Sequence, residues 1–119
     1  MQIRELDLKE LYTIYDVIKQ LYETISYQEF EDLIYDMRHM EYKMLGIMEK
    51  EELITYAGVA IQTNLYSKRH LYVFDFISDS NYDKKIYNNI MLDYLNDYAK
   101  MGMCEQVIFA PHLNISSYN

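Results

Sequence analysis

Glycine is scarce in this chain of 119 residues, which contains only Gly46, Gly58 and Gly102. Loops that hold phosphate on backbone N–H groups commonly use glycine, because the missing side chain lets the ligand approach the main chain closely. A glycine-rich phosphate loop is therefore excluded. Gly58 stands inside an apolar stretch, where a β-bulge or a close approach to the backbone is the usual reason for a glycine.

Cysteine and long apolar runs are also scarce. The single cysteine, Cys104, excludes an internal disulfide and fits a reducing compartment. Charged residues are interspersed through the first ten positions, MQIRELDLKE, which therefore contain no apolar signal core. The longest apolar run, near residues 53–61, is far too short to span a membrane. We therefore predict a cytoplasmic protein without a membrane partner.

Basic residues are outnumbered by acidic ones. The chain has 11 Lys and Arg against 19 Asp and Glu, which gives a formal net charge of −8. This charge repels polyanions, so nucleic acid is disfavoured as a partner. An amine-bearing or basic partner is easier to accommodate.

The residues that are present predict one globular domain over residues 1–119, because half of them are hydrophobic. A short strand at residues 3–6 precedes two amphipathic helices. Asp7 is placed to cap the first helix, and Ser26 with Glu29 forms a capping-box pattern before the second. The predicted apolar faces are Leu11, Ile14, Tyr15, Ile18, Leu21 and Tyr22, then Tyr27, Phe30, Leu33, Ile34, Met37 and Met40.

A β-rich region follows the two helices. Three apolar segments separated by polar turns predict an antiparallel meander. They cover residues 43–49, 53–63 and 71–77. A polar loop then leads into a third helix that Gly102 ends, and residues 106–110 form a last buried strand. This order predicts an α+β fold on a mixed sheet.

Several stretches resemble the GNAT family of N-acetyltransferases, in the family's order. ELITYAG at residues 52–58 and LYVFDFI at residues 71–77 resemble two of its central strands. MLDYL at residues 91–95 resembles the helix that follows them. The resemblance covers nearly the whole chain. It implies a mainly antiparallel sheet flanked by helices, in the order β-α-α-β-β-β-α-β.

The family binds the pyrophosphate of acetyl-CoA on a loop that usually reads R-G-K-G-I-G, and the matching residues here read DKKIYN. The residues that the resemblance places at the CoA site are Phe76, Ile77, Ser78, Asp83, Lys84, Lys85, Ile86, Tyr87 and Asn88. The side chains of Ile86, Tyr87 and Asn88 are expected where phosphate would approach. Asp83 is placed to cap the helix and repel pyrophosphate, whereas Lys84 and Lys85 could attract it. We expect ordinary pyrophosphate binding to be lost, while acetyl-CoA or CoA is the cofactor that the resemblance implies.

The C-terminal residues depart from the family as well. The last six residues resemble the opening of a helix with the pattern N-x-x-A-x-x-F-Y, in which the tyrosine often serves as general acid. Tyr118 is one position away from that tyrosine, so the acid role is not assigned to it. The sequence stops just before the aromatic pair of the pattern, so the final helix and closing strands are predicted to be lacking. The last strand would then be an exposed edge of the sheet. This edge predicts a homodimer, and a truncated gene product is the alternative explanation.

Asp75 matches a strand position where many relatives carry an acidic group near the acceptor amine. The resemblance therefore implies a general base at Asp75, and the alternative is a strand aspartate that faces solvent. No metal site is predicted. The three histidines and Cys104 lack zinc-ligand spacing, and residues 79–90 lack the glycine and glutamate of a calcium loop.

Two functions remain open. The favoured one is a GNAT-fold protein with a degraded pyrophosphate loop, catalytically impaired or inactive, that acts as a binding or dimerising module for a small amine or a protein. The alternative is an active N-acetyltransferase that moves acetyl from acetyl-CoA to an unidentified amine. Free loop N–H groups beside an open strand pair would favour the enzyme, whereas an Asp83 cap would favour the module.

Overall fold

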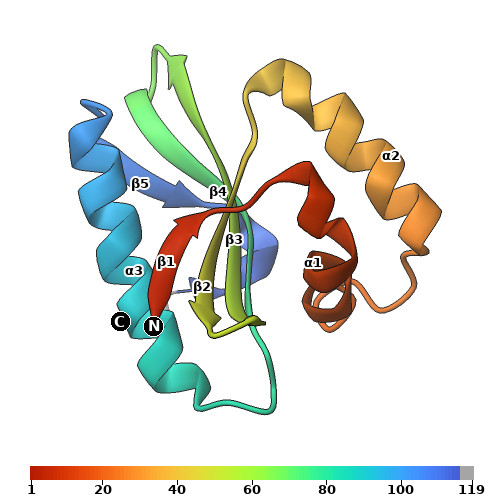
Figure 1. Ribbon diagram of the computed structural model, residues 1–119. Helices are drawn as coiled ribbons and strands as arrows, with labels where there is room; N and C mark the ends of the chain where they lie inside the picture. The colour runs from red at the N-terminus through yellow and green to blue at the C-terminus, as the bar shows by residue number, and fades with distance from the viewer. Residues whose placement is uncertain (116–119) are drawn as a thin grey trace.

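The computed structural model describes residues 1–115, in which five strands form one sheet in the order β1-β2-β3-β4-β5 (Figure 1). The strands are β1 (Gln2–Glu5), β2 (Lys43–Glu49), β3 (Glu52–Asn64), β4 (Lys68–Ser78) and β5 (Gln106–Phe109). The helices are α1 (Leu11–Ile18), α2 (Tyr27–Met37) and α3 (Lys84–Met101), with short 3-10 turns η1 (Leu8–Glu10), η2 (Arg38–Met40) and η3 (Pro111–Leu113). Strands β1 to β4 pair antiparallel, and β5 pairs parallel to β4. The predicted α+β fold with a mixed, mainly antiparallel sheet is confirmed.

The sheet separates two apolar cores. Helices α1 and α2 cover one face, and α3 covers the other (Figure 1). The first core includes Ile14, Phe30, Met44 and Tyr56, and the second includes Leu45, Val73, Met91 and Leu95. Each strand therefore alternates its side chains between two buried layers, which explains the near-continuous apolar runs of β2 and β3.

The predicted helix caps are present. The Asp7 side chain accepts a hydrogen bond from the Lys9 N–H at 2.8 Å, and Ser26 accepts one from the Glu29 N–H at 3.1 Å. The predicted apolar faces are wrong in three respects. Leu33 and Met40 are 45% and 41% exposed, and α1 ends at Ile18 rather than continuing along the predicted face.

The end of α3 is a Schellman motif without glycine at its left-handed position. The Cys104 N–H bonds to the Ala99 carbonyl at 2.9 Å, and the Met103 N–H bonds to the Lys100 carbonyl at 3.0 Å. Met103 has the left-handed φ of 59°, while Gly102, one residue earlier, has φ of −85°. The sequence correctly indicated where the helix ends, but the residue under backbone strain is Met103.

A β-bulge in β4 reorients one acidic side chain. Gly58 of β3 pairs with Asp75, and the next residue, Val59, pairs with Val73, so Phe74 is an extra residue in β4. A bulge of this kind breaks the strict alternation of side chains. Phe74 packs against the α1–α2 core, and Asp75 contacts residues of that same side instead of joining Val73 on the α3 side.

Gly58 makes room for this arrangement. A Cβ atom at Gly58 would overlap the phenol group of Tyr42 and would lie 2.7 Å from Oδ2 of Asp75. The expectation of a bulge or close backbone approach at Gly58 is confirmed on both counts.

We predict that Met103→Gly stabilises the protein. A left-handed conformation costs a non-glycine residue about 1–2 kcal/mol, and Met103 is 83% exposed, so little packing is lost. The added chain entropy of glycine in the unfolded state offsets part of this gain, which leaves a rise of about 0.5–1 kcal/mol in unfolding free energy. Urea denaturation measures the change. An unchanged or lower midpoint would contradict it.

We predict that Gly58→Ala destabilises the protein by about 2–3 kcal/mol, because the new methyl group overpacks the buried Tyr42 phenol. Thermal unfolding followed by circular dichroism measures the effect. Gly102→Ala is the matched control, since its Cβ would meet mainly the terminal methyl group of Ile61 at 2.7 Å and its φ is already negative. Equal melting temperatures for the two variants would refute the steric argument.

Candidate active site

Asp75 accepts hydrogen bonds on both carboxylate oxygens. The Tyr22 hydroxyl donates to Oδ1 at 2.5 Å, and the Tyr42 hydroxyl makes a short hydrogen bond to Oδ2. Tyr22 lies in the turn after α1, and Tyr42 lies directly before β2. The aspartate is therefore not a strand residue that simply faces solvent.

The hydrogen bonds around Asp75 have one consistent direction. Each phenol has a single hydroxyl proton, and Tyr22 and Tyr42 both use it to donate a hydrogen bond to the carboxylate. Tyr56, whose oxygen lies 2.8 Å from that of Tyr42, must then donate to Tyr42. By the same argument Nε2 of His112, 2.8 Å from the Tyr22 oxygen, must donate to Tyr22. Two donor chains thus converge on one carboxylate, an arrangement suited to its ionised form.

The environment acts on Asp75 in two opposing ways. Burial raises the pKa of Asp75 and is the larger effect, so the pKa lies above its usual value, although the hydrogen bonds from Tyr22 and Tyr42 act to lower it. Burial, followed by the nearby Asp75 charge, raises the pKa of Tyr22. The pKa of Tyr42 is raised well above its usual range, chiefly by burial. Both phenols therefore stay protonated and remain donors to the carboxylate.

A small apolar pocket opens on this cluster. It has a volume of about 70 Å³, and Asp75, Tyr22 and Tyr42 contribute its polar groups. The remaining lining residues come from α1, α2 and the turn between them: Ile18, Ile25, Phe30, Leu33, Ile34 and Met37. The pocket thus combines a carboxylate with hydrocarbon walls.

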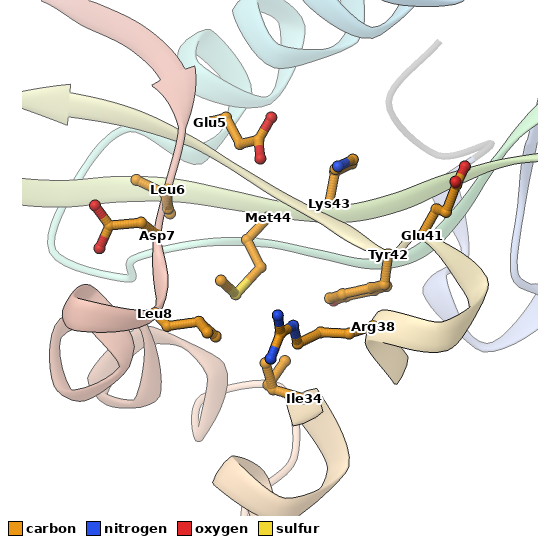
Figure 2. Close-up of a pocket in the computed structure, with 10 residues that line it drawn as sticks. All are labelled: Glu5, Leu6, Asp7, Leu8, Ile34, Arg38, Glu41, Tyr42, Lys43 and Met44. Atoms are coloured by element: carbon orange, nitrogen blue, oxygen red, sulfur yellow. The ribbon is translucent and has the colours of Figure 1, made fainter. Parts of the chain in front are cut away.

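A larger pocket of about 360 Å³ also has Tyr42 in its lining (Figure 2). Tyr42 and Ile34 line both pockets, whereas Asp75 lines only the smaller one. In Figure 2 the guanidinium of Arg38 extends into the larger pocket, near Leu8, Ile34 and Met44. Residues of both charge signs surround it, and its carboxylates come from Glu5, Asp7 and Glu41. We place the candidate site in the smaller pocket because the perturbed carboxylate lies there.

The residues aligned with the CoA site are only partly available to a ligand. The Ser78 hydroxyl donates to Oδ1 of Asn88 at 2.6 Å and also contacts the Thr55 hydroxyl at 2.7 Å. Asn88 is 1% exposed and lines a small pocket together with Ser78 and Lys84. Phe76 is buried in the α3-side core, and Ile77 packs against the α1–α2 core.

The start of α3 is capped by its own chain. The Asp83 carboxylate accepts a hydrogen bond from the Ile86 N–H at 3.2 Å. In the preceding loop, the N–H groups of Ser80 and Asn81 bond to the side chains of Gln20 and Asp79, both at 3.0 Å. The Tyr82 N–H bonds to the Asp79 carbonyl at 3.1 Å. The predicted Asp83 cap is confirmed, and these loop donors are already used. Lys84, Lys85 and Ile86 are exposed and Tyr87 is half-buried.

Strands β4 and β5 separate near the candidate site. They pair over His70–Val73 of β4, which then continues to Ser78, while the chain turns into η3 after Phe109. Leu113 and Ile115 line a pocket of about 90 Å³ beside Phe76 and Ser78. The two strands therefore stop pairing after Val73, and the segment after β5 lies beside the unpaired end of β4. Tyr118 lies outside the described residues.

Four residues of the Asp75 cluster were missed by the sequence reasoning: Tyr22, Tyr42, Tyr56 and His112. They are spread along the chain, and no local spacing connects them. The one local signal was the glycine at position 58 inside a strand, which marks the place where the Tyr42 phenol approaches the backbone.

Residues 1–115 contain no helix that is both long enough and apolar enough to cross a bilayer. Within the same part of the chain, no three His, Cys, Asp or Glu side chains form a group able to hold a metal ion.

Comparison with known proteins identifies the family. Residues 1–111 match the model of the acetyltransferase (GNAT) domain. A GNAT family acetyltransferase from Staphylococcus aureus has a TM-score of 0.80 and 12% identity, covering 92% of this chain and 84% of that one. A ribosomal-protein-alanine N-acetyltransferase from Brucella melitensis has a TM-score of 0.79 and 13% identity, covering 98% and 85%.

Glucosamine-6-phosphate N-acetyltransferase from Arabidopsis thaliana is also similar, with a TM-score of 0.75 and 17% identity over 98% of this chain and 86% of that one. At these identities the structural likeness supports the fold alone. No curated protein matches the sequence. Because the domain model spans almost the whole chain, this protein belongs to the GNAT family of acetyltransferases.

Proposed function

We propose that this chain is a catalytically impaired GNAT-fold protein that keeps an amine-binding carboxylate at Asp75 and has lost most of the family's hold on acyl-CoA. The observation that carries the proposal is the Asp83 cap on α3. Anions bind at helix N-termini through free N–H groups and the positive end of the helix dipole. At this helix a carboxylate of the chain itself already occupies that position.

Two further contacts support weak cofactor binding. The Ser78 hydroxyl is engaged with Asn88 and Thr55 inside the fold. Tyr82 makes a short hydrogen bond to Glu52, which fixes the loop before α3 to the start of β3. The residues present therefore fit the pyrophosphate of acetyl-CoA poorly, although GNAT acetyltransferases as a family use this cofactor. Binding would depend on the exposed side chains of Lys84 and Lys85.

The second candidate is an active N-acetyltransferase. It is favoured by the chain of hydrogen bonds from Asp75 through Tyr22 to the exposed His112, because such a chain can carry a proton between a buried base and solvent. The two candidates differ in affinity for acetyl-CoA and in turnover, and both quantities can be measured directly.

We predict that Asp83→Asn raises the affinity for CoA by about fivefold. Asparagine caps a helix as well as aspartate does, so the helix start is preserved while the negative charge disappears. Removing one repulsion of about 1 kcal/mol accounts for a change of this size. Isothermal titration calorimetry with CoA and acetyl-CoA measures it. Lys84→Gln with Lys85→Gln is expected to weaken binding in the same titration.

The proposal is contradicted by micromolar acetyl-CoA binding to the unmodified protein together with kcat/KM above about 10⁴ M⁻¹s⁻¹ for an amine, since that is ordinary enzyme efficiency. An Asp83→Asn variant with unchanged affinity would show that the cap does not govern cofactor binding.

We also propose that two copies associate through β5, which has β4 as its only partner strand within residues 1–115. Unpaired backbone groups on an edge strand favour pairing with a second chain. Light scattering is then expected to give about twice the chain mass of 14.4 kDa. Ile108→Lys should give the monomer, because an edge lysine opposes pairing. Asn96→Lys, at an exposed position of α3, is the charge-matched control. A monomeric unmodified protein would overturn this proposal.

A further inference from the structure

The polar floor of the Asp75 pocket accepts hydrogen bonds and has no proton left to donate. The protons of Tyr22 and Tyr42 both point to Asp75, so a molecule in the pocket meets carboxylate and phenol oxygens. A ligand whose polar end is a phosphate, a carboxylate or a carbonyl would find no donor there and would face a negative charge. The ligand's polar end must therefore donate, and a positive charge on it is favoured.

The apolar walls of the pocket determine which chemical groups the remainder of the ligand can carry. Six apolar side chains line it, contributed by α1, α2 and the turn that joins them. A second charged group inside such walls would lose its hydration without a partner, which costs several kcal/mol. The ligand should therefore carry its single charge at one end and hydrocarbon elsewhere.

The size of the pocket limits the length of the ligand. A cavity needs a volume of roughly 10–15 Å³ to hold one water molecule. The pocket of about 70 Å³ thus accommodates roughly five non-hydrogen atoms. A longer tail would extend past Leu33, whose side chain is 45% exposed at the rim.

We infer that the acceptor class of this protein is a short aliphatic monoamine, held as its ammonium ion on Asp75 with its hydrocarbon tail between α1 and α2. This inference rests on the proposed function, in that it takes Asp75 as the amine end of the site. It excludes polyamines and phosphorylated amines as preferred ligands. An ammonium group supplies three donors, which match the acceptor oxygens of the pocket floor.

The test is an NMR titration of the ¹⁵N-labelled protein, without CoA, using n-butylamine, n-butanol and 1,4-diaminobutane at neutral pH. We expect saturable shifts of the Gly58 and Asp75 amides with n-butylamine. The alcohol, which lacks the charge, and the diamine, which adds a second one, should each bind at least about tenfold more weakly, a difference of about 1.4 kcal/mol. Equal binding of either control, or no saturation by n-butylamine at about 50 mM, would overturn the inference.

Two variants make the test specific. Asp75→Asn keeps the side-chain size and removes the charge, so the preference of amine over alcohol should disappear. Leu33→Glu places a carboxylate at the rim and should raise the affinity for 1,4-diaminobutane about tenfold relative to n-butylamine, by pairing the second ammonium. Leu65→Glu adds the same charge at a fully exposed position away from the pocket and should change neither ratio. An equal shift in both glutamate variants would show that net charge, and not the pocket, determines binding.

The amine titration tests this inference, and the CoA titration tests the proposed impairment of cofactor binding. If n-butylamine fails to bind while CoA affinity is weak, this inference is wrong and the impaired cofactor site stands. If n-butylamine binds as expected and acetyl-CoA also binds tightly, the amine class stands and the proposed impairment is wrong.

Discussion

The Asp75 carboxylate is the group around which the distant parts of this fold are joined. Tyr22 follows α1, Tyr42 precedes β2, Tyr56 belongs to β3 and His112 belongs to η3. All of them connect to Asp75 directly or through one tyrosine. A partly buried charge is costly unless hydrogen bonds satisfy it. Once Asp75 lies on this face of the sheet, the positions of the surrounding phenols are largely determined.

Backbone geometry makes this arrangement possible. The extra residue at Phe74 brings Asp75 to the side of α1 and α2. The missing side chain at Gly58 then leaves space for Tyr42 to reach it. A regular strand would direct the aspartate toward α3, and a larger residue at position 58 would displace the phenol. Bulges and strand glycines are often found next to functional sites for this reason.

The two ends of the proposed site differ in how far the protein's own groups occupy them. At the end that we propose binds an amine, an apolar pocket leads to a carboxylate that accepts hydrogen bonds from two phenols. At the start of α3, where the family resemblance places pyrophosphate, Asp83 caps the helix and three N–H groups of the preceding loop are bonded within the protein. This asymmetry is what distinguishes the chain from the family pattern that its sequence resembles. Family membership therefore gives the architecture, and the side chains at each end determine the chemistry.

The order of the elements and the caps at Asp7, Ser26 and Asp83 could be predicted from the sequence, because they depend on periodicity and on contacts between residues a few positions apart. The family was predicted from the resemblance of several stretches to its strands and helix. The surroundings of Asp75 could not be predicted in this way, because its partners Tyr22 and Tyr42 lie 53 and 33 positions away. The face on which Asp75 lies and the burial of Asn88 likewise depend on the tertiary structure. A single bulge reverses side-chain alternation. Gly58 marked the region of the bulge, but no local pattern showed that the extra residue is Phe74 of the neighbouring strand.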